Sequence, residues 1–374
     1  MNRYQVLLVL LFCCPAFWMY GQQQPLSFRS QLLCVDNNEV CVIGDINGDG
    51  LDDIVAGRLW YAAPDFVPRP VRPIALHPPE YARNNGEHLW DVDGDGWLDI
   101  ISSGYEEPKI FWFENPGLDF LQKGLEWKEH LWVETEIVRS EIGLFEDLNN
   151  DGIPEYILNS WHDPNPFYFW SFEGEEIKTN RIGPRNGHGV GLGDINGDGK
   201  KDIIFDEGWY EQGQEWTWHR DWKLADSSCP MLVMDLNEDG RNDIIFGRAH
   251  DYGLYWMEQM EPIADSTIWK THLIDESWSQ VHTMTWADLD GDGNGELITG
   301  KRVWAHLGKD PGADEPAVIY RYVWDQQHQS FHRSTINSGE ASTGLFIRVA
   351  DLNHDQKMDL VVAGRKGTYI LWQE

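Results

Sequence analysis

Short apolar runs bounded by polar turns repeat along most of the chain. Each run directly follows an acidic loop, as in DIVAG from Asp53, DIIFD from Asp202, DIIFG from Asp243 and DLVVAG from Asp359. Runs that are this short, rich in Val and Ile, and flanked by Gly and Asp are typical of buried β-strands. No stretch has an apolar pattern of helical period over a useful length, so the sequence predicts an all-β fold.

The runs are organised in repeated units of four strands. One strand leads into the acidic loop, a second leaves it, a third is aromatic as at residues 110–113, and a fourth resembles residues 269–274. Units of this length, each made of four short strands, are typical of the blades of a β-propeller. The sequence predicts a seven-bladed β-propeller that forms a single domain over residues 22–374, with one loop per blade. The loops begin at Asp45, Asp91, Asp147, Asp194, Asp235, Asp288 and Asp351.

The N-terminal strand is expected to complete the last blade. Only two apolar runs follow the seventh loop, at residues 359–364 and 368–372, whereas residues 26–35 resemble a fourth strand without a unit of its own. Pairing between them would close the ring and leave no open sheet edge.

The acidic loops have the ligand pattern of a calcium site. Oxygen-bearing side chains stand at offsets 0, 2, 4 and 8, with Gly at offset 5 in all but the seventh loop, where Gln356 predicts a distorted or empty site. Such an alternation suits Ca²⁺, but no loop has the Glu at offset 11 that an EF-hand requires. We therefore expect structural calcium turns between two strands. The expected ligands are Asp45, Asn47, Asp49, Asp53, Asp91, Asp93, Asp95, Asp99, Asp147, Asn149, Asp151, Glu155, Asp194, Asn196, Asp198, Asp202, Asp235, Asn237, Asp239, Asp243, Asp288, Asp290, Asp292, Glu296, Asp351, Asn353, Asp355 and Asp359.

The charge balance disfavours nucleic-acid binding. The formal net charge is −33, from 62 acidic and 29 basic residues, and much of the acidity belongs to the loops. A surface of this sign repels phosphate backbones.

The N-terminal residues predict export. Arg3 and the apolar run 6–12 are typical of a secretory signal peptide cleaved near Gly21, so residues 1–21 are expected to be removed in a secreted or periplasmic protein. The run is too short for a transmembrane segment, and none is expected elsewhere. Lipid attachment at Cys14 is the less favoured alternative, because the residues before it make a poor lipobox.

The remaining cysteines do not suggest a disulfide framework, because their number is odd. Cys34 and Cys41 could pair in an oxidising compartment, or all three, with Cys229, could remain thiols.

Chemistry-bearing residues gather at one expected face of the propeller. Since each loop joins the first and second strands of a blade, the starts of first strands and the ends of second strands lie on the opposite face, near the axis. The residues at these positions are His88, Glu141, His188, His282, Arg58, Tyr105, Trp161, His162, Trp209, Arg248, His250, Asp251, Tyr252, Lys301, Arg302, His306 and Arg365.

Six of them are candidate catalytic residues. His188 and His282 both stand six residues before a loop Asp, so they could share a substrate or a second divalent ion such as Zn²⁺ or Mg²⁺. An imidazole can take or return a proton near neutral pH. Lys301 and Arg302 could stabilise an enolate or instead pair with neighbouring acids. The leaving group would be assisted by His250 or Tyr252.

Other residues are expected to bind substrate. The insertion 303–316 is rich in Gly and Pro and would form a wall or lid over a pocket. Trp161, Trp209, Trp278 and Trp304 could stack on sugar rings, although core packing competes with this role. The other candidate substrate-binding residues are His88, His162, Asp251, Gln280 and His306.

The loops and the strands after them, over residues 45–374, resemble the FG-GAP/VCBS repeat of integrin-α-like and secreted bacterial propellers. This resemblance implies the fold but little about function. More weakly, HGVGLGDINGDG from His188, AHDYGLYW from Ala249, SWSQVH from Ser277 and TGKRVWAHLGKDPG from Thr299 are similar to the propeller module of aldos-2-ulose dehydratase-type proteins. That second resemblance implies elimination of water from keto-sugars in a metal-bearing cleft. It does not extend to an isomerase step, because no cupin domain is expected.

The sequence thus favours an exported, carbohydrate-active lyase or dehydratase that acts by β-elimination on a keto-sugar or a uronate-containing glycan. The alternative is a non-catalytic propeller that binds glycan or protein, as integrin-like heads do. Several titratable groups at one channel mouth favour the enzyme.

Overall fold

A computed structural model describes residues 26–74, 76–77, 81–82, 84–162, 165–173, 176–263 and 266–374. The expected signal peptide, residues 1–21, lies outside the described residues. Within them, no helix is long and apolar enough to cross a membrane.

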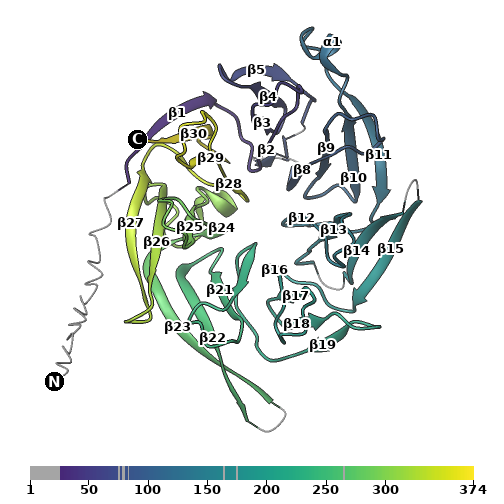
Figure 1. The fold of residues 1–374 in the computed structure, drawn as a ribbon. Helices are drawn as coiled ribbons and strands as arrows, with labels where there is room; N and C mark the ends of the chain where they lie inside the picture. Colours follow the sequence, from purple (N-terminus) through teal and green to yellow (C-terminus); the bar gives the residue numbers. More distant parts are fainter. Residues whose placement is uncertain are drawn as a thin grey trace, which may run out of the picture.

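The protein is an all-β propeller whose sheets surround a common axis (Figure 1). Five sheets have four strands each. They comprise β2 (Val42–Gly44), β3 (Asp53–Ala56), β4 (Leu59–Ala62) and β5 (Val67–Pro70); β8 (Gly86–Trp90), β9 (Asp99–Ser103), β10 (Lys109–Glu114) and β11 (Lys128–Glu134); β12 (Gly143–Glu146), β13 (Glu155–Leu158), β14 (Phe167–Glu173) and β15 (Glu176–Gly183); β24 (Val281–Ala287), β25 (Glu296–Lys301), β26 (Val318–Asp325) and β27 (Ser330–Ser338); and β28 (Ile347–Ala350), β29 (Asp359–Gly364) and β30 (Gly367–Gln373) with β1 (Phe28–Cys34).

Eight further strands form one continuous sheet. They are β16 (Val190–Gly193), β17 (Asp202–Phe205), β18 (Gly208–Glu211), β19 (Thr217–His219), β20 (Met231–Met234), β21 (Asp243–Gly247), β22 (Tyr252–Ile263) and β23 (Ser266–Ser279). Two short strands, β6 (Leu76–His77) and β7 (Tyr81–Ala82), pair with each other. The remaining short elements are the helix α1 (Leu118–Leu121) and the 3₁₀ turn η1 (Ala305–Gly308).

The prediction of seven separate four-stranded blades is wrong, because the described residues form five such sheets and one sheet of eight strands. The eight-stranded sheet arises where β16 and β20 pair in parallel, with Gly191 opposite Met231 and Leu192 opposite Leu232. Glycine makes this approach possible. A Cβ at Gly191 would lie 2.3 Å from the carbonyl oxygen of Met231, and one at Gly193 would lie 2.4 Å from Cβ of Val233.

The N-terminal strand β1 lies antiparallel to β30, with Phe28 opposite Gln373. The indole Nε1 of Trp372 donates to Oε1 of Gln31 at 2.8 Å, which adds a side-chain contact to the backbone pairing. The outermost strand of the sheet formed by β28 to β30 therefore comes from the N-terminal part of the chain.

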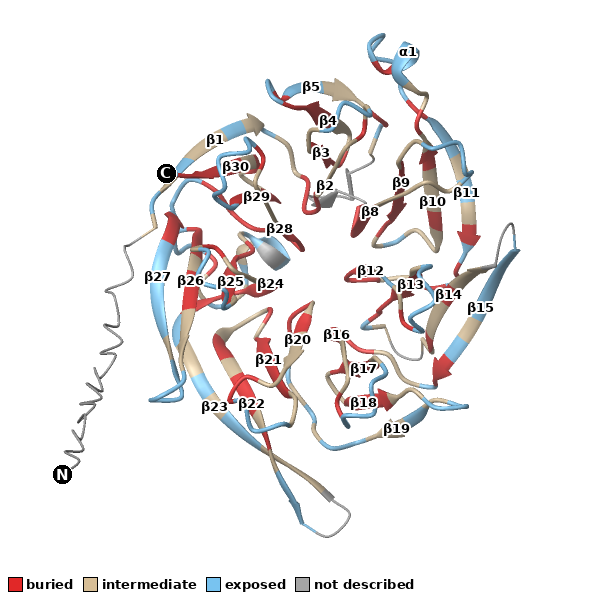
Figure 2. Ribbon diagram, viewed as in Figure 1, coloured by how far each residue is buried: buried red, intermediate tan, exposed pale blue. Residues whose placement is uncertain are grey.

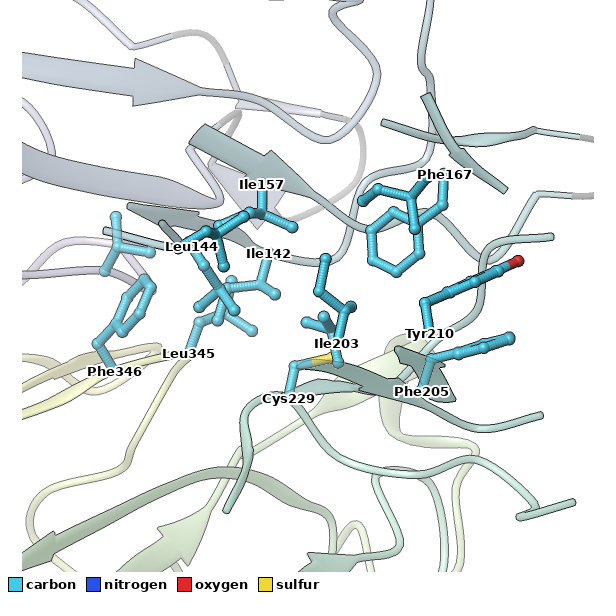
Figure 3. Close-up of a cluster of buried hydrophobic side chains, with 14 residues drawn as sticks. Ile142, Leu144, Ile157, Phe167, Ile203, Phe205, Tyr210, Cys229, Leu345 and Phe346 are labelled. Atoms are coloured by element: carbon cyan, nitrogen blue, oxygen red, sulfur yellow. The ribbon is translucent and has the colours of Figure 1, made fainter. Parts of the chain in front are cut away.

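The core lies between neighbouring sheets. The second strands of the sheets, such as β3, β9 and β29, are buried along their whole length, whereas the outer strands β11, β15 and β27 are largely exposed (Figure 2). In Figure 3, Ile142 and Ile157 gather with Ile203 and Phe205 of the adjacent sheet. Strands packed on both faces read as continuous apolar runs, which explains the DII-type pattern of the sequence.

Buried carboxylates at the end of four acidic loops connect strands of the same sheet. Asp53 accepts hydrogen bonds from the backbone N–H of Ile46 at 3.2 Å and of Ala63 at 2.8 Å. Asp99, Asp202 and Asp359 make the same pair of contacts. Because each joins the loop to the end of the third strand, the residue at offset 8 is a structural brace.

The glycine at the parallel junction should be required for stability. We expect Gly191→Ala to lower the free energy of unfolding by about 1–3 kcal/mol, since the added methyl group would overlap a backbone oxygen. Urea denaturation checks this, with Ser334→Ala on the exposed strand β27 as the control. An unchanged midpoint for Gly191→Ala would contradict the proposed reason for the eight-stranded sheet.

Candidate functional site

A cavity of about 770 Å³ opens on the face where the first strands of the sheets begin. It is lined by residues that precede first strands, follow second strands or belong to the loop after β25. They are Glu39, Asn85, Tyr105, Glu141, Trp161, His162, Asn165, Arg185, Asn186, Gly187, His188, Asp206, Glu207, Asp226, His250, Arg302, His306, Leu307 and Lys309. This volume is within the range usual for small-molecule binding sites.

Three imidazoles meet beside this cavity: His188 and His250 line it, whereas the fully buried His282 does not. His188 precedes β16, His250 follows β21, and His282 belongs to β24. The ring centroids of His188 and His250 are 4.9 Å apart, those of His250 and His282 are 4.9 Å apart, and those of His188 and His282 are 6.0 Å apart. One nitrogen from each ring lies within 4.8 Å of the other two, so the group could hold a metal ion.

Hydrogen bonds determine which nitrogens of His188 and His250 carry protons. Nδ1 of His188 lies 2.9 Å from the carbonyl oxygen of Ser227, and Nδ1 of His250 lies 3.0 Å from Oδ2 of Asp310. Both partners are acceptors, so each Nδ1 is a donor and each neutral ring keeps its lone pair on Nε2. These two Nε2 atoms are 3.0 Å apart, a separation that requires a cation or a shared proton between them.

The third imidazole is buried without hydrogen bonds. Within the described residues neither ring nitrogen of His282 has a hydrogen-bond partner. Burial lowers the pKa of His282 well below its ordinary value, and burial also lowers the pKa of His250 to about 3. Both rings are therefore neutral and able to donate a lone pair.

An anionic glutamate lies beside the histidines. Oε2 of Glu141 is 3.9 Å from Nε2 of His188, and Oε1 is 3.7 Å from Nε2 of His282. Burial by itself would raise the pKa of Glu141, but the charge and the hydrogen bond of the neighbouring Arg302 cation bring the pKa below its ordinary value. Arg302 donates to Oε1 of Glu141 at 2.6 Å and to both carboxylate oxygens of Glu39 at 2.7 Å.

The donor set fits a divalent ion of the zinc type. Three imidazoles with a nearby carboxylate match a catalytic Zn²⁺ site, which keeps one position for water or substrate. Mg²⁺ prefers oxygen ligands, so this nitrogen-rich group fits it poorly.

Sequence reasoning missed three acidic residues at this site. Asp310 accepts from Nδ1 of His250 and lies 3.0 Å from Nδ1 of His306, whose ring stacks on His250 at 4.2 Å. Asp206 lines the cavity, its Oδ1 has no hydrogen-bond partner among the described residues, and burial raises its pKa to about 6. Asp206 follows β17 directly, a position that could have revealed it. No comparable position in the sequence distinguished Asp310 or Glu39.

Lys301 and Tyr252 hold the insertion 303–316 in place and do not line the cavity. The buried ammonium group of Lys301 donates to the carbonyl of Gly312 and lies 3.6 Å from Oε2 of Glu315. The Tyr252 hydroxyl donates to Oε1 of Glu315 at 2.6 Å. The other end of the insertion brings His306 and Leu307 to the cavity wall.

The predicted substrate-binding residues separate into two groups. Trp161, His162 and His306 line the cavity. His88, Trp209, Asp251, Trp278, Gln280 and Trp304 do not.

The residues outside the cavity have other contacts. Trp209 donates to Asp221 at 3.0 Å, and Trp278 donates to the hydroxyl of Tyr322 at 2.8 Å. Asp251 pairs with Arg248 at 2.8 Å. Gln280 is fully buried with a positive φ of 66°, whereas Trp304 is exposed.

Residues 147–205 and 235–299 match the family model described as the FG-GAP-like repeat. The chain carries FG-GAP-like repeats.

Two solved structures are similar to this chain in fold. The V. cholerae biofilm matrix protein Bap1 is 11% identical, with 92% of this chain and 91% of that chain covered and a TM-score of 0.48. The Myceliophteria thermophila Cps50 (Swd1) β-propeller domain is 10% identical, with 92% and 100% covered and a TM-score of 0.49. Nothing further follows from either likeness, and no curated protein matches the chain.

The acidic loops differ in how their carboxylates are used. Asp91, Asp93 and Asp99 of the second loop bring carboxylate oxygens within 4.8 Å of one another, as do the four acids of the sixth loop. In the sixth loop, however, Arg321 donates to Asp290 and, at 2.8 Å, to Glu296. A guanidinium there competes with any metal ion.

Calcium binding by the second loop should appear as added stability. We expect Ca²⁺ to raise the melting temperature and a chelator to reverse this, with about 2.7 kcal/mol gained per site at 100-fold excess over Kd. Asp93→Ala should reduce the calcium response, whereas Asp65→Ala, at an exposed turn, should leave it unchanged. Calorimetric melting measures both. Equal responses in the two variants would contradict a calcium site at this loop.

His88 should make the protein sensitive to acid. Its Nε2 lies 2.9 Å from the Gly143 carbonyl, and burial lowers its pKa to about 3, with Arg348 adding to the effect. The unfolded chain binds a proton near pH 6.5 and the folded chain does not, so stability falls as pH drops from 6.5 towards 3. The slope is at most about 1.4 kcal/mol per pH unit.

His88→Gln keeps a donor for Gly143 but cannot take up a proton. Its free energy of unfolding, measured by urea denaturation between pH 6.5 and 4, should therefore fall less steeply than that of the wild type. His354→Asn, at an exposed position, is the control. Parallel curves for His88→Gln and the wild type would show that this imidazole does not titrate differently on unfolding.

Proposed function

We propose that this protein is an exported, metal-dependent carbon–oxygen lyase that performs β-elimination on a carbohydrate, either a keto-sugar or a uronate-containing glycan. The observation that carries the proposal is the approach of the two Nε2 atoms of His188 and His250 to 3.0 Å while both Nδ1 protons are held elsewhere. This pair lies at the wall of the cavity, next to a third unpartnered imidazole.

In this proposal His188, His250 and His282 hold a divalent ion, for which Zn²⁺ is the best match. When bound, the ion supplies a Lewis acid that polarises the carbonyl or carboxylate oxygen next to the reacting carbon. Arg302 is already paired with Glu39 and Glu141, so its role is to keep Glu141 beside the imidazoles. Asp310 orients His250 and keeps its proton on Nδ1.

Asp206 is the proposed general base. Its Oδ1 is buried at the cavity wall without a hydrogen-bond partner among the described residues. The proton of the α-carbon passes to this carboxylate, and the C–H electron pair becomes the new C=C bond. The leaving oxygen departs with its bonding pair and takes up a proton, which Asp206 can return. The step is redox-neutral and needs no other reactant.

Trp161 and Tyr105 would hold the sugar. Trp161 is 41% exposed, and its ring centroid lies 6.5 Å from that of Tyr105. Both residues line the cavity. Exposed aromatic faces suit the apolar faces of sugar rings.

The activity test uses 2-keto-sugars and uronic polysaccharides with the Zn²⁺-loaded protein. The enone or unsaturated-uronate absorbance should rise for the wild type and disappear in chelator. Asp206→Asn should lower kcat by about 10²–10⁴-fold, because it removes the proton acceptor. The exposed Asp314→Asn should leave the rate unchanged.

Two results would reject the lyase. One is an absence of product with every substrate although the protein binds the metal. The other is an Asp206→Asn rate equal to that of the wild type, which would remove the assigned base.

A second candidate is a non-catalytic glycan- or protein-binding propeller. It is favoured by the pairing of Lys301 with the insertion and of Arg302 with two glutamates, which leaves neither cation directed at a substrate. For such a protein, replacing His188 and His282 by Ala would change affinity for the ligand, and no reaction rate would be measurable.

A further inference from the structure

We infer that Arg139, His162 and Trp161 form a subsite at the cavity rim for the anionic substituent of a sugar, either a uronate carboxylate or a sulfate ester. The inference rests on the proposed function only in taking a carbohydrate as the occupant of the cavity. It adds a binding group that lies apart from the imidazole cluster.

Arg139 is not itself a lining residue, and the backbone holds it next to the lining residue Tyr105. Arg139 lies in the loop between β11 and β12 with a φ of 57°, in the left-handed region that non-glycine residues rarely adopt. Its N–H donates to the carbonyl of Tyr105 at 2.6 Å, and Tyr105 itself lines the cavity. Strain of this kind persists where surrounding contacts enforce it, and it is common at binding sites.

The guanidinium is held by two rim residues. Its carbon lies 5.1 Å from the centroid of the Trp161 ring, and NH1 lies 3.2 Å from Nδ1 of His162. A guanidinium only donates, so Nδ1 of His162 is the acceptor and the neutral ring carries its proton on Nε2. Because His162 and Trp161 line the cavity, this arrangement provides one cation and one further N–H donor at the same rim.

The charge of Arg139 is not neutralised by an acidic residue within the described part of the chain. This is unusual in a chain with 62 acidic and 29 basic residues. By comparison, the lining residues Arg302 and Arg185 pair with Glu141 and Glu207. Stacking on an indole fixes the plane of the guanidinium, and a fixed fork binds a planar carboxylate or a sulfate through parallel hydrogen bonds.

The acidic lining of the cavity limits where an anion can bind. Glu207 and Asp226 lie on the wall, so a ligand with many negative charges would be repelled there. A sugar chain with one anionic group at the rim and neutral hydroxyls deeper in the cavity matches this distribution. The shared chemistry is therefore an acidic oligosaccharide.

Calorimetric titration of the full chain measures binding to the subsite. A chelator is present so that the proposed metal-dependent elimination does not occur during the measurement. The probes are an oligosaccharide with a single terminal uronate, the same oligosaccharide with a single sulfate ester in its place, and the uncharged oligosaccharide of equal length. We expect the wild type to bind one or both acidic probes, and Arg139→Gln to weaken that binding at least tenfold without changing the neutral probe. Arg139→Lys keeps the positive charge but loses the planar guanidinium. Its affinity for the carboxylate probe should therefore remain below that of the wild type.

A matched control exists on the outer surface. Arg69 lies over Trp60 with its guanidinium carbon 5.0 Å from the ring centroid, the same stacked arrangement away from the cavity. Arg69→Gln should leave all three affinities unchanged. Preference for the uronate-bearing probe identifies the carboxylate as the ligand, and preference for the sulfated probe identifies the sulfate ester.

The inference is overturned if neither acidic probe binds, if the neutral probe binds as tightly as both, or if Arg139→Gln and Arg69→Gln behave alike. Failure of the lyase is a separate result. If the acidic probes bind through Arg139 but no elimination occurs with metal, the subsite stands and the proposed reaction falls.

Discussion

Arg302 connects parts of the ring that are far apart in the chain. It follows β25 and pairs with Glu39, which precedes β2, and with Glu141, which precedes β12. All three side chains are buried, so removing one partner would leave an uncompensated charge in a region of low dielectric. The same interaction holds Glu141 next to His188 and His282. The stability of the axis and the electrostatics of the candidate site therefore depend on one cation.

The carboxylate contacts in the acidic loops repeat from one sheet to another, whereas the side-chain contacts near the axis do not. Four buried carboxylates at the ends of acidic loops, Asp53, Asp99, Asp202 and Asp359, join the loop to the third strand of their sheet. These braces leave the loops on one face and the beginnings of the first strands on the other. Because the side chains on the second face are not part of this repeated brace, they can differ from sheet to sheet. That freedom allows His188, His250 and His282 to meet at one point.

The insertion 303–316 links the outer framework to the cavity. Lys301 and Glu315 hold its base, while Asp310 connects it to His250. A chain segment fixed at both ends can position side chains at the wall without belonging to a sheet. Lys301, which was expected from the sequence to act on substrate, therefore contacts the protein itself.

The sequence by itself determined the all-β propeller, the strand pattern, the loop positions and the face on which His188 and Arg302 lie. These features follow from apolar periodicity and turn chemistry, which are local. Only the tertiary structure decided that β16 and β20 merge into one sheet, that Lys301 faces the protein, that Asp206 lines the cavity and that Asp310 contacts His250. Such contacts join residues far apart in sequence, and no short-range pattern encodes which of many acids and bases will meet.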